Sequence, residues 1–360
     1  GERRVHRTIG SDGSIVAQEY ESRSEAKGFR PGLAALGDIK KSWTLTDFLA
    51  MDDQFNFKIK RQEEATCKGV SLDTASCVSF QSYMQTLGWR QGRCGYLYGT
   101  VEDEKVRVEC VYEPPQQGTE TSFEVDRDDG LAPTVEAAAG HLGLKKVGWI
   151  FAPPPREQGF VFAGAEALMA AELQLEAADG VNATPFVTVK VTVNDGGEAN
   201  FEAYQVSLQC MAMVAEGALG PLDDDLAACA VHPTFTAVVE GKRADKVDTN
   251  FFLCNVPVAQ HASPIFAAGA SFPALNRLPP PGPDDLKPSL AALQHSPDLL
   301  VPNLLADFGL ILYLASVPQI FDPLTFLPAL CEAILAHRHG LPALLDDGYR
   351  LLLFSFAGLF

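Results

Sequence analysis

The chain has 360 residues, of which 47% are hydrophobic and 21% charged, as expected of a folded protein with two or three domains. Its formal charge is −18, and the acidic excess lies after residue 62, where 17 Lys/Arg stand against 37 Asp/Glu. So acidic a body repels phosphate backbones, which excludes nucleic acid as a partner and favours basic protein surfaces. Charge alone leaves open the alternative that the acidity only maintains solubility.

Apolar stretches and cysteines indicate the compartment. The stretch 304–317 is too short for a bilayer and is interrupted by Asp307, so no membrane insertion is expected. The eight cysteines include no Cys-x-x-Cys pair, and Cys110 and Cys254 lie within apolar strand-like segments. Such cysteines are typical of small core side chains in a reducing compartment, here the cytoplasm or nucleus.

The first 64 residues show no sustained periodicity. Residues 1–40 mix charges with Gly and Ser, which is typical of a linker, and 41–64 form a connecting segment. Within it, residues 44–47 could begin a short helix.

From residue 65 to 220, strand-like and helix-like patterns alternate, which predicts a mixed α/β domain. Residues 71–74 precede a helical run in which Phe80, Tyr83 and Met84 share one face. Further predicted strands are 94–99, 106–112, 146–151, 185–193 and 202–207, and further predicted helices are 132–143, 165–178 and 211–216.

Residues 221–360 are predicted to form a second, α-rich domain. Strand-like segments at 234–239 and 250–256 come first, followed by a proline-rich spacer or exposed loop at 279–283. Leucine-rich patterns then predict helices at 304–315 and 324–337.

The segment Val147-Gly-Trp-Ile-Phe-Ala-Pro-Pro154 bears on catalysis. It resembles a strand-to-loop segment of metal-dependent deubiquitinases of the MPN fold, which reads Val-Gly-Trp-Tyr-His-Ser-His-Pro. The two zinc-ligand histidines of that pattern fall on Phe151 and Pro153, which have no lone pair to give a metal. Its glutamate, serine and aspartate fall on Gly92, Val161 and Gly164. With all five functional positions replaced, we expect neither catalysis nor a metal or other cofactor.

Two other kinds of site are weaker candidates. His337-Arg-His339, with Asp346 and Asp347 downstream, has the wrong spacing, and the helix dipole explains histidines at a helix C-terminus. No Gly-x-Ser-x-Gly elbow, cysteine-protease signature, P-loop or dinucleotide fingerprint is present.

A set of motifs in fixed order identifies a family. Residues 94–99 (Cys-Gly-Tyr-Leu-Tyr-Gly), 111–118 (Val-Tyr-Glu-Pro-Pro-Gln-Gln-Gly) and 147–151 (Val-Gly-Trp-Ile-Phe) are followed by Asp248-Thr-Asn-Phe-Phe-Leu253 and Ser271-Phe-Pro-x-x-Asn-Arg277. The chain thereby resembles the nuclear protein localization protein 4 family over about residues 40–360. The absence of zinc-finger cysteines makes it similar to the plant and algal branch.

The resemblance implies an inactive, metal-free MPN domain at 65–220 and an α-rich C-terminal domain at 221–360. It implies that 1–40 follow a ubiquitin-like domain that would precede Gly1. The motif residues expected to be structural are Gly95, Tyr98, Gly99, Glu113, Pro114, Pro115, Gln116, Gly118, Gly148 and Trp149.

By the same resemblance, the chain would be a ubiquitin-binding adaptor of an AAA-type segregase. Its partners would be ubiquitin and ubiquitin chains, the segregase and the ubiquitin-fusion-degradation partner subunit. It would work in the cytoplasm and nucleus and at the surface of the endoplasmic reticulum, while its ubiquitin groove stays unassigned. A metal-dependent deubiquitinase and a purely structural MPN scaffold are the alternatives.

Overall fold

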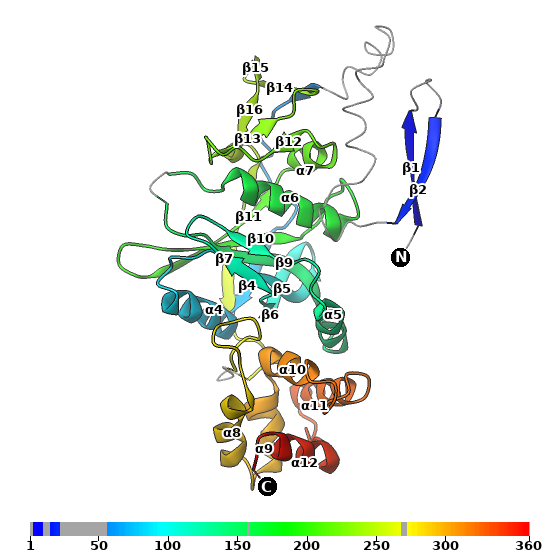
Figure 1. Cartoon of the computed structure of the whole chain (residues 1–360), viewed down its shortest axis with the longest axis vertical. Coiled ribbons are helices and arrows are strands. Elements are labelled where there is room, and N and C mark those ends of the chain that lie inside the picture. The colour runs from blue at the N-terminus through cyan, green and yellow to red at the C-terminus, as the bar shows by residue number, and fades with distance from the viewer. Residues whose placement is uncertain (1–2, 10–14, 22–55, 157–158, 268–271, 360) are drawn as a thin grey trace. The chain divides into compact units, whose positions relative to one another are not determined.

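The computed structural model describes residues 3–9, 15–21, 56–156, 159–267 and 272–359 (Figure 1). The expected helix start at 44–47 lies outside these residues. The chain divides into two compact units, which are described separately below. The first comprises Gly1–Lys68, Arg156–Thr188 and Ala203–Val256, and the second comprises Gly69–Pro155, Val189–Glu202 and Pro257–Phe360.

The largest sheet has eight strands in the order β17-β11-β10-β9-β5-β6-β4-β18. Their bounds are β4 (Gly69–Asp73), β5 (Arg93–Glu102), β6 (Lys105–Tyr112), β9 (Lys145–Ala152), β10 (Val187–Val193), β11 (Ala199–Val206), β17 (Leu253–Val256) and β18 (Val258–His261). Strand β5 is antiparallel to β6 and β9, and β4 is parallel to β6 and β18. The five strands predicted between residues 94 and 207 are thus confirmed, as is a mixed α/β architecture.

In the second unit, helices accompany this sheet and continue to the C-terminus. They are α4 (Thr74–Thr86), α5 (Ala132–His141), α8 (Pro283–Ala292), α9 (Pro297–Leu300), α10 (Phe308–Ala315), α11 (Phe326–Arg338) and α12 (Asp347–Phe356). A small hairpin is formed by β7 (Gln116–Gly118) and β8 (Phe123–Val125). Helix α4 begins where predicted, because the Asp73 carboxylate accepts a hydrogen bond from the Ser76 amide at 2.8 Å and caps the first turn.

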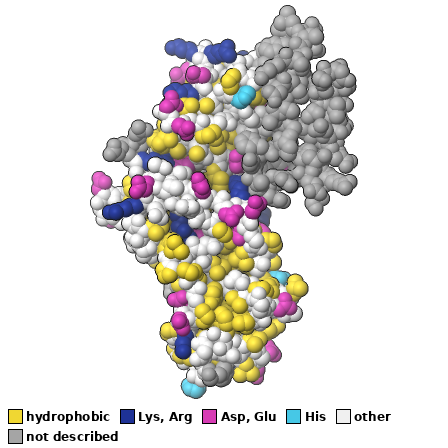
Figure 2. Space-filling model, viewed as in Figure 1, with side chains coloured by type: hydrophobic (Ala, Val, Ile, Leu, Met, Phe, Trp, Pro, Cys, Tyr) yellow, Lys and Arg dark blue, Asp and Glu magenta, His cyan; other side chains and the backbone are white. Residues whose placement is uncertain are grey.

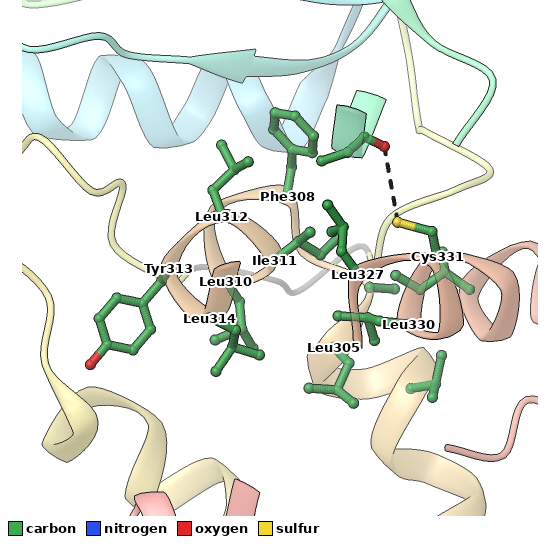
Figure 3. Close-up of a cluster of buried hydrophobic side chains, with 14 of the residues drawn as sticks. Leu305, Phe308, Leu310, Ile311, Leu312, Tyr313, Leu314, Leu327, Leu330 and Cys331 are labelled. Carbon is green, nitrogen blue, oxygen red and sulfur yellow. Dashed lines mark hydrogen bonds between the residues drawn. The ribbon is translucent and has the colours of Figure 1, made fainter. Parts of the chain in front are cut away.

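The C-terminal helices share one hydrophobic core with α5 (Figure 3). Leu310, Ile311 and Leu330 are fully buried in it. The Cys331 thiol points across this core to the Ala138 carbonyl of α5 at 3.9 Å. The helices after residue 283 therefore pack on the same unit as the central strands.

The helix predicted at 304–315 starts later than expected. Residues Val301–Leu305 form a single π-helical turn, and α10 begins only at Phe308. Asp307 has an extended backbone and accepts a hydrogen bond from the Leu310 amide at 3.1 Å, so it caps a new helix instead of continuing the old one. The sequence prediction was wrong because the apolar pattern runs through this break.

The first unit combines small sheets with two helices. Its elements are β1 (Arg3–Ile9), β2 (Ile15–Glu21), β3 (Asn56–Lys58), α6 (Gly164–Ala178), α7 (Leu208–Ala215), β12 (Leu219–Gly220), β13 (Ala228–Val231), β14 (Thr236–Val239), β15 (Lys242–Ala244), β16 (Lys246–Asp248) and the 3-10 turn η2 (Thr249–Phe251). Strands β1 and β2 pair antiparallel within the stretch expected to be a linker. In 221–360, strands occupy residues 228–261 and the helices begin at Pro283.

All eight cysteines are buried and none forms a disulfide, which confirms their prediction as core side chains. In the part of the chain that the structure describes, no single helix has the length and apolar character needed to cross a membrane. One bent pair, Pro297–Leu305 with Phe308–Ala315, passes that test only jointly, across a 100° bend.

Trp149 anchors the core on one face of β9. It is fully buried, stacks on Phe151 with ring centroids 4.7 Å apart, and meets Phe123 of β8 edge-on at 6.2 Å. Trp149→Ala should therefore lower the free energy of unfolding by about 3–5 kcal/mol, measured by urea denaturation. Val78→Ala, at a 55% exposed site of α4, is the control and should change little. Unchanged stability in Trp149→Ala would contradict a core role.

Candidate functional site

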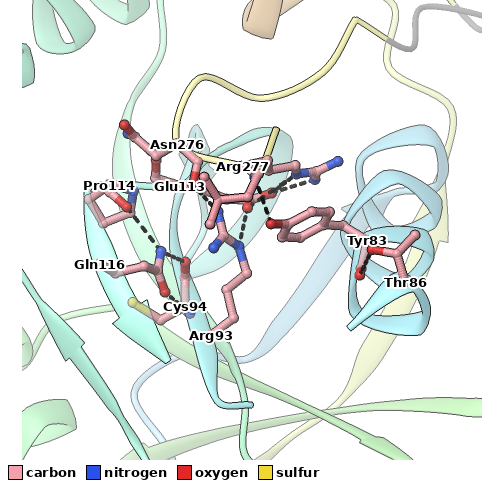
Figure 4. A network of polar contacts seen from close by, with 10 residues as sticks. Tyr83, Thr86, Arg93, Cys94, Glu113, Pro114, Gln116, Asn276 and Arg277 are labelled. Carbon is pink, nitrogen blue, oxygen red and sulfur yellow. Dashed lines mark hydrogen bonds and ion pairs between the residues drawn. The ribbon is translucent and has the colours of Figure 1, made fainter. Parts of the chain in front are cut away.

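A deeply buried charge network of the second unit centres on Glu113, at the start of the Glu-Pro-Pro-Gln motif (Figure 4). Its carboxylate is 2% exposed and lies between two guanidinium groups. Arg93, the first residue of β5, donates to one oxygen through Nε. Arg277 donates to the other through Nη2 and also through Nε, at 3.0 Å. Two cations thus pair with one buried anion.

The same two arginines lie over the ring of Tyr83 on α4. Their guanidinium carbons are 4.7 Å (Arg93) and 4.8 Å (Arg277) from the ring centroid, within the range of cation–π attraction. The Tyr83 hydroxyl accepts a hydrogen bond from the Leu278 amide at 2.9 Å. Asn276 donates from Nδ2 to the Glu113 carbonyl at 2.8 Å and accepts from Arg93 Nη2 at its own carbonyl, at 3.0 Å. The network therefore ties the 113–118 motif to the 276–278 loop.

Gln116 continues the network to the edge of β5. Its amide Oε1 accepts from the Cys94 backbone N–H at 2.7 Å, and its Nε2 donates to the Cys94 carbonyl, also at 2.7 Å. A second bond from Nε2 reaches the Pro114 carbonyl at 3.1 Å. The Gln116 side chain thus pairs with both the N–H and the carbonyl of Cys94, as the backbone of a neighbouring strand would.

The ionisation of Glu113 reflects these contacts. Burial alone raises the pKa of the Glu113 carboxyl, but Arg93 and Arg277 together outweigh it and hold that pKa below its usual range. The carboxylate is therefore charged at neutral pH. The network has three charged side chains, Glu113, Arg93 and Arg277. Loss of any one leaves a buried charge uncompensated, which strongly destabilises the fold.

The remaining motif residues lie in or beside β5, β6 and β9. Gly95, Tyr98 and Gly99 are buried in β5, Pro114 is buried, Pro115 is half-buried, and Gly148 is buried in β9. The Tyr98 hydroxyl donates to Glu136 at 2.7 Å. A side chain at Gly118 would lie 2.4 Å from the Gly92 carbonyl, so the end of the motif packs backbone to backbone.

Three of the five positions aligned with the metal site lie in the second unit, and they are filled by packing. Phe151 is fully buried and stacked on Trp149, and Pro153 is also buried. At Gly92, an added Cβ would lie 2.6 Å from the Ser122 carbonyl oxygen, so no glutamate fits without moving the backbone. These positions offer no metal ligand and no general base.

The other two positions lie in the first unit. Val161 is half-buried, and Gly164 begins α6. A Cβ at Gly164 would approach the Ala228 carbonyl oxygen to 2.5 Å, so this position is also closed to an aspartate.

The rival histidines end a helix. His337 lies in the last turn of α11 and His339 is its C-cap, while Asp346 caps α12. Among the described residues, no three His, Cys, Asp or Glu side chains gather closely enough to hold a metal ion. The cysteines are equally unsuited to catalysis, since burial raises the pKa of the Cys77, Cys94, Cys229 and Cys331 thiols to about 12.

A serine, a histidine and a glutamate do meet on β4, β18 and β6. Ser71 Oγ lies 2.7 Å from His261 Nδ1, and His261 Nε2 lies 3.4 Å from Glu109 Oε2. Ser71 stands mid-strand in β4, which pairs with β6 on one side and β18 on the other. Its neighbouring amides are thus engaged in the sheet and leave no oxyanion hole. We interpret the cluster as a tie that holds β18.

A cavity of about 80 Å³ adjoins Glu113 and is lined by Asp73, Ser76, Arg277, Asp307 and Phe308 among others. Its volume suits a few water molecules and its polar walls offer them partners. It is too small for a peptide segment.

Sequence reasoning selected Glu113 and Gln116 but missed Arg93 and the roles that Tyr83 and Arg277 have in the network. The Asn-Arg pair at 276–277 was noted only as part of a motif. The one available signal was that a glutamate beside two prolines needs a cation if it is buried, and the sequence does not say which arginine supplies it.

Replacing Glu113 tests the network. Glu113→Gln keeps the shape but leaves two buried guanidinium groups without an anion, so the free energy of unfolding should fall by about 3–5 kcal/mol. Asp225→Asn, which breaks the exposed pair with Lys246, is the matched control and should leave the urea midpoint almost unchanged. Equal effects of the two changes would mean that Glu113 contributes no more than a surface pair.

The pH dependence of stability should follow from the lowered Glu113 pKa. Because this carboxyl holds its proton less tightly when folded, its stabilisation is complete above the unfolded-state pKa of about 4.3 and is lost as pH falls through the lower folded-state value. The stability gap between the native chain and Glu113→Gln should thus be constant from about pH 5 upward and narrow below pH 4. Urea midpoints at several pH values measure it, and a gap independent of pH would contradict the assignment.

Comparison with known proteins places the chain in a family. Residues 93–247 match the model of the NPL4 family. The chain is 30% identical to NPL4-like protein 1 of Arabidopsis thaliana over 353 residues, which are 96% of this chain and 80% of that protein. It is 31% identical to NPL4-like protein of Oryza sativa subsp. japonica over an alignment of 362 positions, gaps included, which covers 97% of this chain and 82% of that protein. Identity to nuclear protein localization protein 4 homolog of Homo sapiens is 34%, over 36% of this chain and 26% of that protein. The chain belongs to the NPL4 family.

Proposed function

We propose that this chain is a non-catalytic adaptor that binds ubiquitin chains and presents ubiquitin-tagged proteins to an AAA-type segregase. Such clients would include misfolded proteins exported from the endoplasmic reticulum and destined for the proteasome. The observation that carries the proposal is that none of the five aligned positions holds a metal-binding or acid–base side chain, and that the structure fills or blocks four of them. Where an MPN isopeptidase needs two histidines and a glutamate, this chain has a stacked Phe151, a buried Pro153 and a sterically blocked Gly92.

The proposal assigns an inactive MPN-like domain to residues 65–220 and an α-rich domain to 221–360. The named motif residues would be structural, and the Glu113 network supports this by using both side chains and backbone of the 113–118 motif internally. A rigid, non-reactive body suits a protein that holds a tagged client without cutting the tag.

Family membership supports the partners. The relatives are named for nuclear protein localization, which fits a protein found in the nucleus. We further propose that the chain pairs with the ubiquitin-fusion-degradation partner subunit and also works in the cytoplasm, at the surface of the endoplasmic reticulum. The residues of its ubiquitin groove stay unassigned.

Ubiquitin binding is the decisive test. The chain should bind lysine-linked ubiquitin chains more tightly than a single ubiquitin, because several ubiquitins raise the effective concentration. With 17 Lys/Arg against 37 Asp/Glu after residue 62, association with the partly basic face of ubiquitin should slow as salt rises, while dissociation depends less on salt. Stopped-flow kinetics over a salt series measure both rates.

The alternatives predict different results. A metal-dependent deubiquitinase would carry one tightly bound zinc and cleave a ubiquitin dimer in a chelator-sensitive reaction, which elemental analysis and a cleavage assay would detect. A purely structural MPN scaffold would bind no ubiquitin chain even with the partner subunit present. Binding of ubiquitin chains without any salt effect would support the adaptor proposal and would mean that the acidic charge serves only solubility.

A further inference from the structure

The C-terminal helices border an open cavity that the adaptor proposal does not use. It has a volume of about 550 Å³ and lies between α12 and the segment that joins α8 to α9. We call it the C-terminal groove; its apolar walls are Leu293, Pro297, Leu300, Leu351 and Phe354. Cavities of this size accommodate several side chains of a ligand.

Helix α12 is apolar on more than its core face. Leu353 and Phe354 are buried in the unit, yet the neighbouring Leu351 and Leu352 are 58% and 41% exposed. Leu299 of α9 is a further exposed leucine, at 41%. Exposed leucines that gather beside a cavity are typical of an interface.

The charges around the groove are mostly acidic. Residues 283–359 contain eight Asp/Glu and three Lys/Arg. Asp347 lines the groove with a side chain that is 84% exposed, and the exposed Asp298 follows Pro297 in α9. Within the lining, Asp347 pairs with Arg350 at 2.5 Å and the two charges balance, so the acidic excess beside the groove comes from Asp298 and from the exposed Asp346, which precedes Asp347. In Figure 2, acidic side chains lie among hydrophobic ones over the C-terminal helices.

This combination selects one kind of occupant. An acidic rim repels anionic lipid, nucleic acid and acidic peptides, and it attracts Lys and Arg. An apolar groove with anchors on facing helices fits the apolar face of a helix. We propose that the C-terminal groove binds a basic amphipathic helix of a partner protein, with its apolar side chains in the cavity and its cations near Asp298 and Asp346. The test of this site uses no ubiquitin, so its outcome and that of the adaptor proposal can be told apart.

The test uses the whole chain and a fluorescent peptide of about 18 residues, five helical turns, with leucines on one face and lysines on the other. Fluorescence anisotropy should report binding in the micromolar range that weakens as salt rises. A peptide with the same leucine face but glutamates in place of lysines should not bind. A scrambled leucine–lysine peptide of identical composition should bind much more weakly, since it has no continuous apolar face.

Two matched variants locate the site. Leu351→Gln removes an exposed apolar wall of the groove without changing charge and should raise Kd at least about tenfold. Leu324→Gln alters a more exposed leucine, 85% accessible and outside the groove, and should change Kd less than about twofold. Thermal melting of both variants should match that of the native chain, because both side chains face solvent.

Three results would overturn the proposal. The two variants could bind equally, which would place the peptide elsewhere. The scrambled peptide could bind as well as the amphipathic one, which would mean attraction by charge alone. The free chain could be a dimer in light scattering that Leu351→Gln dissociates, which would assign the groove to a second copy.

Discussion

A single buried carboxylate constrains much of the second unit. Glu113 cannot leave water unless cations come with it, because an isolated ion in a protein interior costs several kcal/mol. Arg93 and Arg277 meet that need. Both also lie over the Tyr83 ring, and Arg93 donates to the Asn276 carbonyl. The network therefore fixes the relative positions of four segments: the beginning of β5, the end of β6, helix α4 and the 276–278 loop. Hydrogen bonds depend more steeply on distance and angle than apolar contacts do, so this network restricts small displacements of these segments more strongly than apolar packing would.

Much of the fold follows from local patterns. The strands at 94–99 and 106–112 were predictable because β-branched and aromatic residues alternate around an acidic turn, and α4 because Asp73 precedes an apolar face. The break at Asp307 was not, since leucines continue on both sides and only the extended backbone of one aspartate separates two helices. Long-range pairings were equally hidden: nothing near Glu113 says that its second cation stands more than 160 residues later in the chain.

What could be predicted about the candidate site came mainly from the residue types at the positions aligned with the metal ligands. Residue types alone show that phenylalanine and proline hold no metal at positions 151 and 153, and this required no coordinates. What the sequence could not give is how the positions are filled. Phe151 is half of an aromatic stack with Trp149, and Gly92 lies against the Ser122 carbonyl. The C-terminal groove could not be predicted from the sequence. Leucines at 351 and 352 are typical of a core, and only the structure shows that these two side chains are exposed.

The close approach at Gly92 limits what substitution at this position could achieve. Placing the residues of an active isopeptidase at positions 92, 151 and 153 would not build a reaction centre. A glutamate at 92 would collide with the carbonyl of Ser122, and a histidine at 151 would replace half of a stacked pair in the core. The hairpin of β7 and β8 would have to retreat first, and Gly118 packs that hairpin directly onto the Gly92 carbonyl. Each such step would lower stability before any catalytic group was in place, so the packing of the neighbouring backbone opposes a hydrolytic site at these positions.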